Sequence, residues 1–153
     1  MLRMSRLTDY GTVILTRMAR EETALHTSAS LAAETHLGPA TVAKILKGLA
    51  HAGLVSSQRG AHGGYRLARP ADQISAASII DALEGPIAIT ECAANVHQCE
   101  LEPYCGVGTA WQRINAAIRR ALADITLAQL ASWKRGTVPH IDLGPGPGLE
   151  QHV

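Results

Sequence analysis

All three cysteines of the chain, Cys92, Cys99 and Cys105, lie within one stretch of fourteen residues. Six residues separate the first pair and five separate the second. Zinc knuckles and common ferredoxin motifs mostly use shorter gaps, of about two to four residues. An iron-sulfur cluster is larger than a zinc ion and suits wider gaps. The spacing therefore favours a cluster, while zinc, thiol redox chemistry and three unrelated buried cysteines stay open.

Three thiolates leave one coordination position of such a site open. His97 lies inside the cysteine segment, and the acidic side chains of Glu91, Glu100 and Glu102 are close to it in sequence. Asp9 is remote in sequence, on the first expected helix. A lone histidine in a loop is more often solvated than bound to metal. The residues alone do not choose among these candidates.

Length and composition place these cysteines in a protein of one ordinary domain, or of a small domain with a dimerisation arm. The chain has 153 residues and an odd, low number of cysteines, which favours a metal or redox role over a disulfide framework. Its first residues, MLRMSRLTDY, hold no apolar signal core. No apolar run reaches the roughly 18 residues of a transmembrane helix. We therefore expect a cytoplasmic protein with no membrane partner.

Charge is distributed unevenly along the chain. Residues 1–70 hold nine Lys or Arg and four Asp or Glu, a net of +5, whereas residues 71–108 hold six acidic residues and no basic one. Residues 109–153 carry five basic and three acidic residues, a net of +2. A basic first part is expected of a surface that meets phosphate, although many solvated faces are equally basic.

Three helices are expected in that basic part. Residues 5–20 place Leu7, Tyr10, Ile14 and Met18 on one stripe. A short helix follows over 28–37, with Ser28 as its expected N-cap. Gly38-Pro39 opens a third helix that ends at Gly53, because proline suits the first helical position. On the third helix, Val42, Ile45, Leu46 and Leu49 form the apolar face; the opposite face shows Ala40, Thr41, Lys44, Lys47 and His51.

Two short strands should follow, LVSSQ and YRLAR, joined by the glycine-rich RGAHGG. Tyr65 and Leu67 share one face of this hairpin, and Arg59 and His62 lie in or beside its loop. Two helices joined by a tight turn and followed by a basic hairpin indicate a winged helix-turn-helix. The alternative is a small helical domain whose hairpin only covers the core. The fold class expected is thus mainly α with a small β wing.

The remainder of the chain predicts two further helices. The segment ISAASIIDALEGP forms a short one that ends at Gly85-Pro86. Beyond the cysteines, Trp111, Ile114, Ile118 and Ile125 follow spacings of three and four, as in helices that pair along their length. Such a short seam must pack on something, either a second subunit or the protein's own core. The tail 133–153 is rich in Gly and Pro, and we expect it to be disordered.

These motifs resemble the Rrf2 family of bacterial winged-helix transcription regulators, which includes IscR and NsrR. The resemblance spans residues 1–132 and rests on LTDYGTVIL, LAHAGLVSSQRGAHGGYRLARP, ISAASIIDALEGP and the cysteines beyond. The stretch TECAANVHQCELEPYCGVGTAWQRIN is most similar to the subgroup that regulates the SUF iron-sulfur assembly operon. The resemblance implies a homodimeric repressor of cluster-assembly genes, gated by a bound iron-sulfur cluster (2Fe-2S or 4Fe-4S) that senses cluster status, redox state or nitric oxide.

The same resemblance implies roles for individual residues and for segments. The helix-turn-helix would occupy 1–85, the cluster-binding cysteine loop 86–108 and a long dimerisation helix 109–132. Cys92, Cys99 and Cys105 would bind the cluster, with Asp9 of the second subunit as a candidate fourth ligand, because Gly108 stands where IscR-like members have a histidine. Six residues would contact a pseudo-palindromic operator in double-stranded DNA: Ser28, Thr41, Lys44, Lys47, Arg59 and His62.

Two other classes of protein fit part of the pattern. An iron-sulfur carrier or scaffold, or a zinc or thiol redox switch, would need the cysteines but no basic wing. An enzyme would need an acid-base constellation near a nucleophilic cysteine, and apart from His97 the neighbouring sequence offers none. We therefore expect that the protein is not an enzyme.

Overall fold

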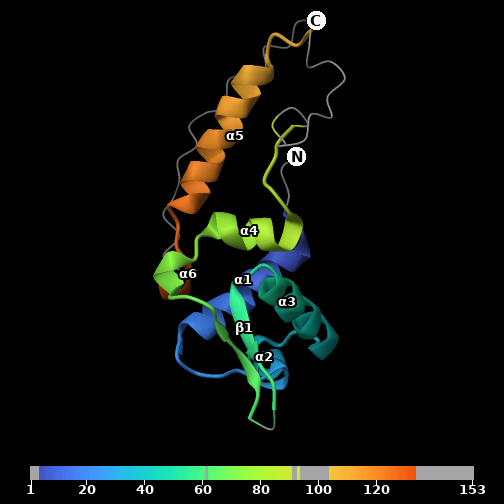
Figure 1. Cartoon of the computed structure of the whole chain (residues 1–153), viewed down its shortest axis with the longest axis vertical. Helices are drawn as coiled ribbons and strands as arrows, with labels where there is room; N and C mark the ends of the chain where they lie inside the picture. Colours follow the sequence, from blue (N-terminus) through green and yellow to red (C-terminus); the bar gives the residue numbers. More distant parts are fainter. Residues whose placement is uncertain (1–3, 61, 91–92, 94–103, 134–153) are drawn as a thin grey trace, which may run out of the picture.

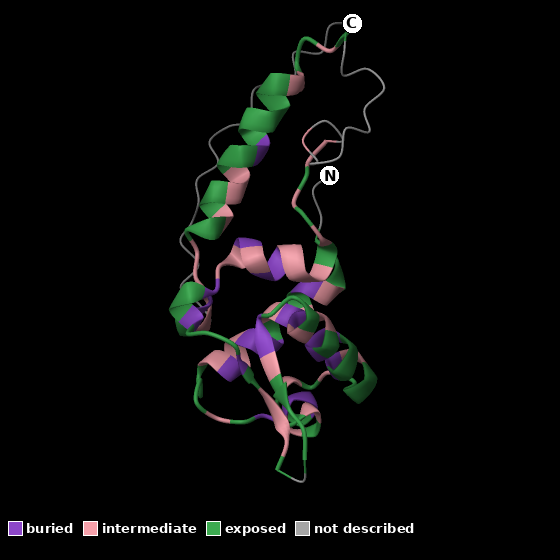
Figure 2. Ribbon diagram, viewed as in Figure 1, coloured by how far each residue is buried: buried purple, intermediate pink, exposed green. Residues whose placement is uncertain are grey.

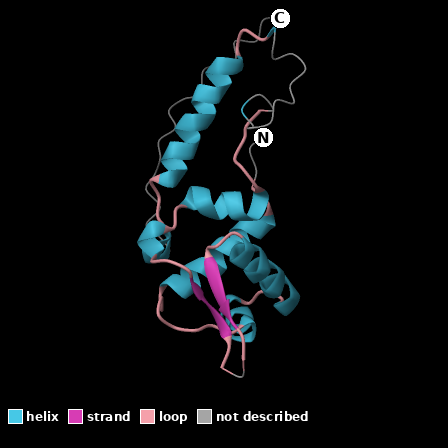
Figure 3. Ribbon diagram, viewed as in Figure 1, coloured by secondary structure: helices cyan, strands magenta, loops and turns pink. Residues whose placement is uncertain are grey.

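The structure is a computed structural model that describes residues 4–60, 62–90, 93 and 104–133. These residues are mostly helical and include one small antiparallel hairpin (Figure 3). In chain order the elements are α1 (Arg6–Ala19), α2 (Ser28–Thr35), α3 (Pro39–His51), β1 (Val55–Gln58), β2 (Gly64–Leu67), a short 3-10 turn (Ala71–Gln73), α4 (Ala76–Glu84), α5 (Gly108–Ala123) and α6 (Leu127–Ser132). The expected fold class, mainly α with a small β wing, is confirmed.

The core lies among α1, α3 and the elements that pack on them. Ile14 and Leu15 of α1 and Leu46 of α3 are fully buried, as are Leu31 of α2 and Leu127 of α6. Burial of aliphatic side chains of this size contributes about 1.5–3 kcal/mol each to folding. Figure 2 shows that most buried segments lie in the lower part of the molecule, below the projecting helix α5. The apolar stripes expected on the first and third helices are therefore the faces that form the core.

The hairpin is anchored to the helices on one side. Val55 pairs with Leu67 and Ser57 with Tyr65, so these four residues lie on one face of the hairpin, where Val55 and Leu67 are buried in the core. Tyr65 also exchanges two backbone hydrogen bonds with His26, whose chain segment connects α1 to α2 (N···O 2.8 and 2.7 Å). These bonds extend the ladder beyond its two strands and fix the hairpin beside the helix-turn-helix.

Helix α4 closes the core across α1 and α3. A capping box starts it, in which the Ser75 and Ser78 side chains each accept from the backbone N–H of the other residue. Gly11 of α1 allows close approach here, because a Cβ at this position would lie 2.4 Å from Cδ1 of Leu83. The Leu83 side chain of α4 thus packs directly against the α1 backbone at Gly11.

Helix α5 projects away from this domain (Figure 1), and most of its residues are exposed (Figure 2). The continuous helix expected over 109–132 is wrong in one respect, because α5 ends at Ala123 and a second helix, α6, begins at Leu127. The side chains of Thr126 and Gln129 form a capping box that starts α6. Helix α6 packs on α1, with Leu127 completely buried. None of the described helices is both long and apolar enough to cross a membrane.

Candidate nucleic-acid interface and cysteine segment

Helices α2 and α3 form the helix-turn-helix. The Thr27 side chain, not that of the expected Ser28, caps α2, and Ser30 completes a capping box with it. Ser28 is the first residue of α2 and is half-buried. His36 ends α2 in the left-handed conformation (φ 56°), and the chain then turns through Gly38 into Pro39.

One face of α3 is open to solvent. Val42, Ile45, Leu46 and Leu49 are buried on its inner face. Lys44 and Lys47 are exposed on the outer face, with Thr41 half-exposed beside them. Neither lysine has an ion-pair partner among the described residues. Because an α-helix fits the major groove of DNA, this face offers two free cations and a hydroxyl to phosphate and base edges.

The tip of the hairpin presents a second basic site. Gly60 has a φ of 119°, which side chains rarely allow, and Gly63 donates its N–H to the Gly60 carbonyl (3.0 Å). A Cβ on Gly63 would lie 2.4 Å from the Gln58 carbonyl oxygen. These two glycines form a tight turn that holds Arg59 and His62 exposed at the tip. The structure therefore places both expected wing residues in solvent at the tip of the hairpin.

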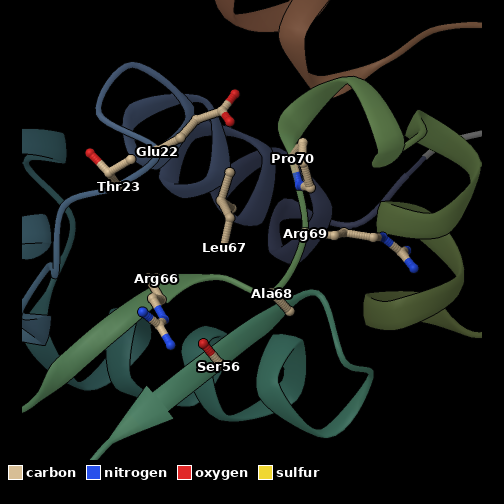
Figure 4. Close-up of a pocket in the computed structure, with 8 residues that line it drawn as sticks. All are labelled: Glu22, Thr23, Ser56, Arg66, Leu67, Ala68, Arg69 and Pro70. Carbon is tan, nitrogen blue, oxygen red and sulfur yellow. The ribbon is translucent and has the colours of Figure 1, made fainter.

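The outer face of the hairpin carries arginines that the sequence analysis did not select. A hollow of about 530 Å³ is lined by Glu22, Thr23, Ser56 and residues 66–70 (Figure 4). Arg66 pairs with Ser56 across the strands, and the side chain of Arg69 points away from Arg66. Period two along β2 would have found Arg66, because it alternates with the inward Tyr65 and Leu67. The cations do not converge as a small-anion site requires, so they add positive charge beside the wing instead.

Only one of the three cysteines lies in the described residues. Cys105 is a free, half-buried thiol three residues before α5. Gly108 begins that helix, and a Cβ there would lie 4.0 Å from the Cys105 sulfur, which is an ordinary van der Waals distance. Cys92, Cys99 and His97 lie outside the described residues. Within the described part, no three His, Cys, Asp or Glu side chains gather where they could hold a metal ion.

Asp9, the candidate fourth ligand, is exposed in the first turn of α1. That turn is fixed by Glu84 at the end of α4, whose Oε1 accepts from the Ser5 N–H (2.8 Å) and from the Thr8 hydroxyl. The two hydrogen bonds hold the pKa of Glu84 below its ordinary value. Asp9 therefore sits on a rigid turn and points toward solvent rather than into its own domain.

The four residues expected to pair between subunits lie on and beyond α5. Trp111 and Ile114 are 38% and 44% exposed, although both are large and apolar. Ile118 is half-buried. Ile125 lies past the end of α5, where its carbonyl accepts from the Ala76 N–H (2.8 Å). The exposed part of the seam is thus the first half of α5.

Residues 4–132 match the Rrf2 family, whose description is iron-dependent transcriptional regulator. The chain belongs to the Rrf2 family. It is 34% identical over 136 residues to the HTH-type transcriptional regulator CymR of Bacillus subtilis, a match that covers 88% of this chain and 94% of the relative. The Rrf2 chain is therefore a transcriptional regulator and not an enzyme.

Solved structures of Rrf2 regulators have the same fold. The structure of CymR, described as the global cysteine regulator of B. subtilis, matches with a TM-score of 0.68 and 33% identity, over 88% of this chain and 99% of that one. IscR of T. potens matches with a TM-score of 0.62 and 27% identity, over 88% of this chain and 94% of that one. Regulators of this family bind DNA and commonly form dimers, which agrees with the open face of α3 and the exposed seam on α5.

Proposed function

We propose that this Rrf2 regulator is a cytoplasmic, homodimeric repressor of iron-sulfur cluster assembly genes, and that a bound iron-sulfur cluster controls its affinity for DNA. The observation that carries the proposal is the combination of two features in one chain. A helix-turn-helix and wing present exposed cations to solvent, and a segment containing three cysteines connects that domain to α5. The likeness to IscR and the family description, iron-dependent, support the cluster as the signal.

In this proposal α3 enters the major groove, and the hairpin tip reaches the neighbouring minor groove or backbone. Thr41 and Lys44 face base edges or phosphate, with Lys47 and the N-terminal residue of α2, Ser28, near the backbone. Arg59 and His62 make the wing contacts. A twofold dimer reads a pseudo-palindromic operator with half-sites about one helical turn apart.

The donor chemistry fits an iron-sulfur cluster, since thiolates are its usual ligands. Cys92, Cys99 and Cys105 would hold it, and the exposed Asp9 on the partner's α1 would supply an oxygen. A bound cluster would supply iron-thiolate and iron-carboxylate bonds that oxidants and nitric oxide attack. Asp9 in turn would tie the cysteine segment of one subunit to the DNA-binding domain of the other. Gly108 has no side chain that could act as the fourth ligand.

The proposed organisation assigns one task to each part of the chain. Residues 1–85 bind DNA, 86–108 form the cluster loop and α5 forms the dimer arm, whereas α6, the last part of the expected segment 109–132, packs on the DNA-binding domain. The tail expected from residue 133 lies, from residue 134 on, outside the described residues. Because the loop joins the DNA-binding domain to α5, a change in the loop can alter the distance between the two α3 helices. Couplings between sites of this kind are typically about 1–3 kcal/mol.

A visible spectrum with iron and sulfide assays on anaerobically purified protein tests the cofactor. DNA retention at low and high salt, with and without the cluster, tests the regulator. The proposal expects visible absorption, stoichiometric sulfide and a sequence-selective complex whose affinity depends on the cluster. A carrier or scaffold would show the cluster but no selective complex with DNA.

A second candidate function is a thiol switch that controls cysteine metabolism without a metal. It is favoured by the likeness to CymR, which is described as a global cysteine regulator, and by the free Cys105 thiol. In this case the purified protein holds no sulfide, and its affinity for DNA follows the oxidation of its thiols. The same spectrum and assays separate the two candidates.

A further inference from the structure

A polar joint connects α4, α5 and the chain that leaves α4. The carboxylate of Asp81 on α4 accepts two hydrogen bonds from Arg119 on α5, Nη1 to Oδ1 at 3.0 Å and Nη2 to Oδ2 at 2.8 Å. Oδ1 also accepts from the backbone N–H of Ile87 (3.2 Å). One carboxylate thus binds the second helix and the segment that follows Pro86. A bidentate arginine-carboxylate pair fixes the relative orientation of its two planes, which a single contact does not.

Asn115 holds the same segment from the side of α5. Its Nδ2 donates to the Ile87 carbonyl (3.0 Å) and to the Ala93 carbonyl (3.4 Å). Asn115 is only 6% exposed, although most of its helix is open to solvent. Ile87 is therefore bound through its N–H by α4 and through its carbonyl by α5.

The joint lies where the DNA-binding domain meets the proposed dimer arm. Helix α4 packs on α1 and on α3, and α5 contacts α4 (Figure 1). The pKa of Arg119 is raised by its hydrogen bonds with Asp81, so the guanidinium stays charged at physiological pH. A change in the angle at this joint would turn α3 relative to α5 without any change in the core.

The length of α5 makes that angle important. Its 16 residues span about 24 Å at about 1.5 Å per residue. A tilt of roughly 10° at one end would displace the other end by about 4 Å, and one base-pair step of DNA is about 3.4 Å. A joint that allows such a tilt would tolerate a displacement of one half-site as large as the rise of one base pair.

We propose that Asp81, Arg119 and Asn115 are positioning residues that fix the angle between the DNA-binding domain and α5, and thereby set the half-site spacing that the dimer accepts. The inference rests on the proposed dimeric DNA binding. Among the described residues, their side-chain hydrogen bonds join Asp81 to Arg119 and reach the backbone of Ile87 and Ala93. The inference assigns to them discrimination between operators rather than affinity for a half-site.

The test uses full-length protein and DNA selected from a random pool by the parent protein. The same half-sites are then joined with one base pair inserted, with one removed, or kept as a single half-site. We expect the parent to prefer the selected spacing by about tenfold, a common size for a coupling between sites. In Arg119→Ala the preference should fall to about threefold or less, while the affinity for the single half-site stays unchanged. Asn115→Ala should shift the spacing preference in the same direction.

Arg120→Ala is the matched control, because Arg120 is the exposed next residue of α5 and forms no ion pair among the described residues. Arg119→Lys keeps the charge but cannot bond both carboxylate oxygens in one plane, so it should also lose preference. Arg119→Lys replaces Arg119→Ala in the test if circular dichroism shows that Arg119→Ala does not fold.

An unchanged spacing preference in the Arg119 variants, or an equal loss of preference in Arg120→Ala, would overturn the inference. A parent that selects DNA without any spacing preference also overturns it but leaves the DNA-binding proposal standing, whereas a parent that selects no DNA ends both.

Discussion

Arginines in the described residues have two different roles. Arg17 of α1 donates to Glu21, and its ion pair with Glu34 links α1 to α2. The hydrogen bond with Glu21, followed by the contact with Glu34, raises the pKa of Arg17 above its ordinary value. Arg59 is exposed at the hairpin tip and has no ion-pair partner in the described part of the chain. Its charge is therefore free for phosphate, which a count of basic residues does not reveal.

We predict that Arg59→Ala weakens DNA binding and lowers the salt dependence of the affinity by about one counterion, because each phosphate contact releases about one ion. The measurement is the slope of log Kd against log salt concentration by fluorescence anisotropy. Arg20→Ala is the control, since Arg20 is also exposed but lies at the end of α1. The same affinity and slope in Arg59→Ala and the parent would remove the wing from the interface.

The fourth ligand is a second question that single residues decide. We predict that Asp9→Ala keeps dimerisation and DNA binding but gives a changed or short-lived cluster spectrum, because a carboxylate is a weaker ligand for iron than a thiolate. His97→Ala should leave the spectrum nearly unaltered. Visible absorption and circular dichroism of anaerobic protein would measure both. The reverse pattern would transfer the role to His97, and no effect of either variant would favour a glutamate, a small thiol or an open position.

At the level of elements, periodicity predicted most of the fold because the same side chains that define the stripes fill the core. Ile14 and Leu46 are examples. Starts of helices were harder, because adjacent hydroxyl residues compete for one cap, as Thr27 and Ser28 do. The break before α6 had a signal in Thr126 and Gln129, a capping-box pair inside an apolar pattern that otherwise continues. Links between distant elements, such as Asp81 with Arg119, leave no local pattern in sequence.

The cap of α2 yields a paired prediction. Thr27→Ala should lower the free energy of unfolding by about 1 kcal/mol, because it removes the side-chain oxygen that accepts from the Ser30 N–H. Ser28→Ala should cost clearly less, since Ser28 is already inside the helix. Urea denaturation of both variants measures the difference. If Ser28→Ala were the costlier change, the assignment of the cap would be wrong.

The contact between α4 and the start of α1 should depend on pH. Glu84 has a pKa below its ordinary value of 4.5 when folded, so its hydrogen bonds stabilise the fold above that value and are lost as pH falls through the lower, folded pKa. We predict that the urea midpoint of the parent falls between about pH 5 and pH 3, and that Glu84→Gln reduces this fall. An identical pH profile in the variant would show that the two hydrogen bonds do not contribute.

For the whole molecule, the helices divide into a packed domain and an arm. The elements from α1 to α4, together with α6, share one core, whereas α5 leaves large apolar side chains in solvent. Exposed Trp and Ile on a helix of 16 residues are costly for an isolated subunit and suit a surface that a second copy covers. The packing of α6 on α1 fixes the C-terminal end of the arm to the domain, so that pairing through α5 would position the whole DNA-binding unit.

Dimerisation through α5 is open to direct measurement. Trp111→Ala should weaken the dimer, because truncation of a tryptophan that becomes buried typically costs about 3–5 kcal/mol, and the 38% exposure of Trp111 in the single subunit leaves much of its surface for a partner to cover. Arg113→Ala is the control, since residue 113 lies about 200° round the helix from residue 111. Sedimentation equilibrium over a range of concentrations should show a dissociating dimer for Trp111→Ala and a stable dimer for Arg113→Ala. A parent protein that sediments as a monomer would contradict the prediction that α5 pairs with a second subunit. A dimer equally stable in all three proteins would place the interface on another surface, and the joint between α4 and α5 could not then set the distance between the α3 helices.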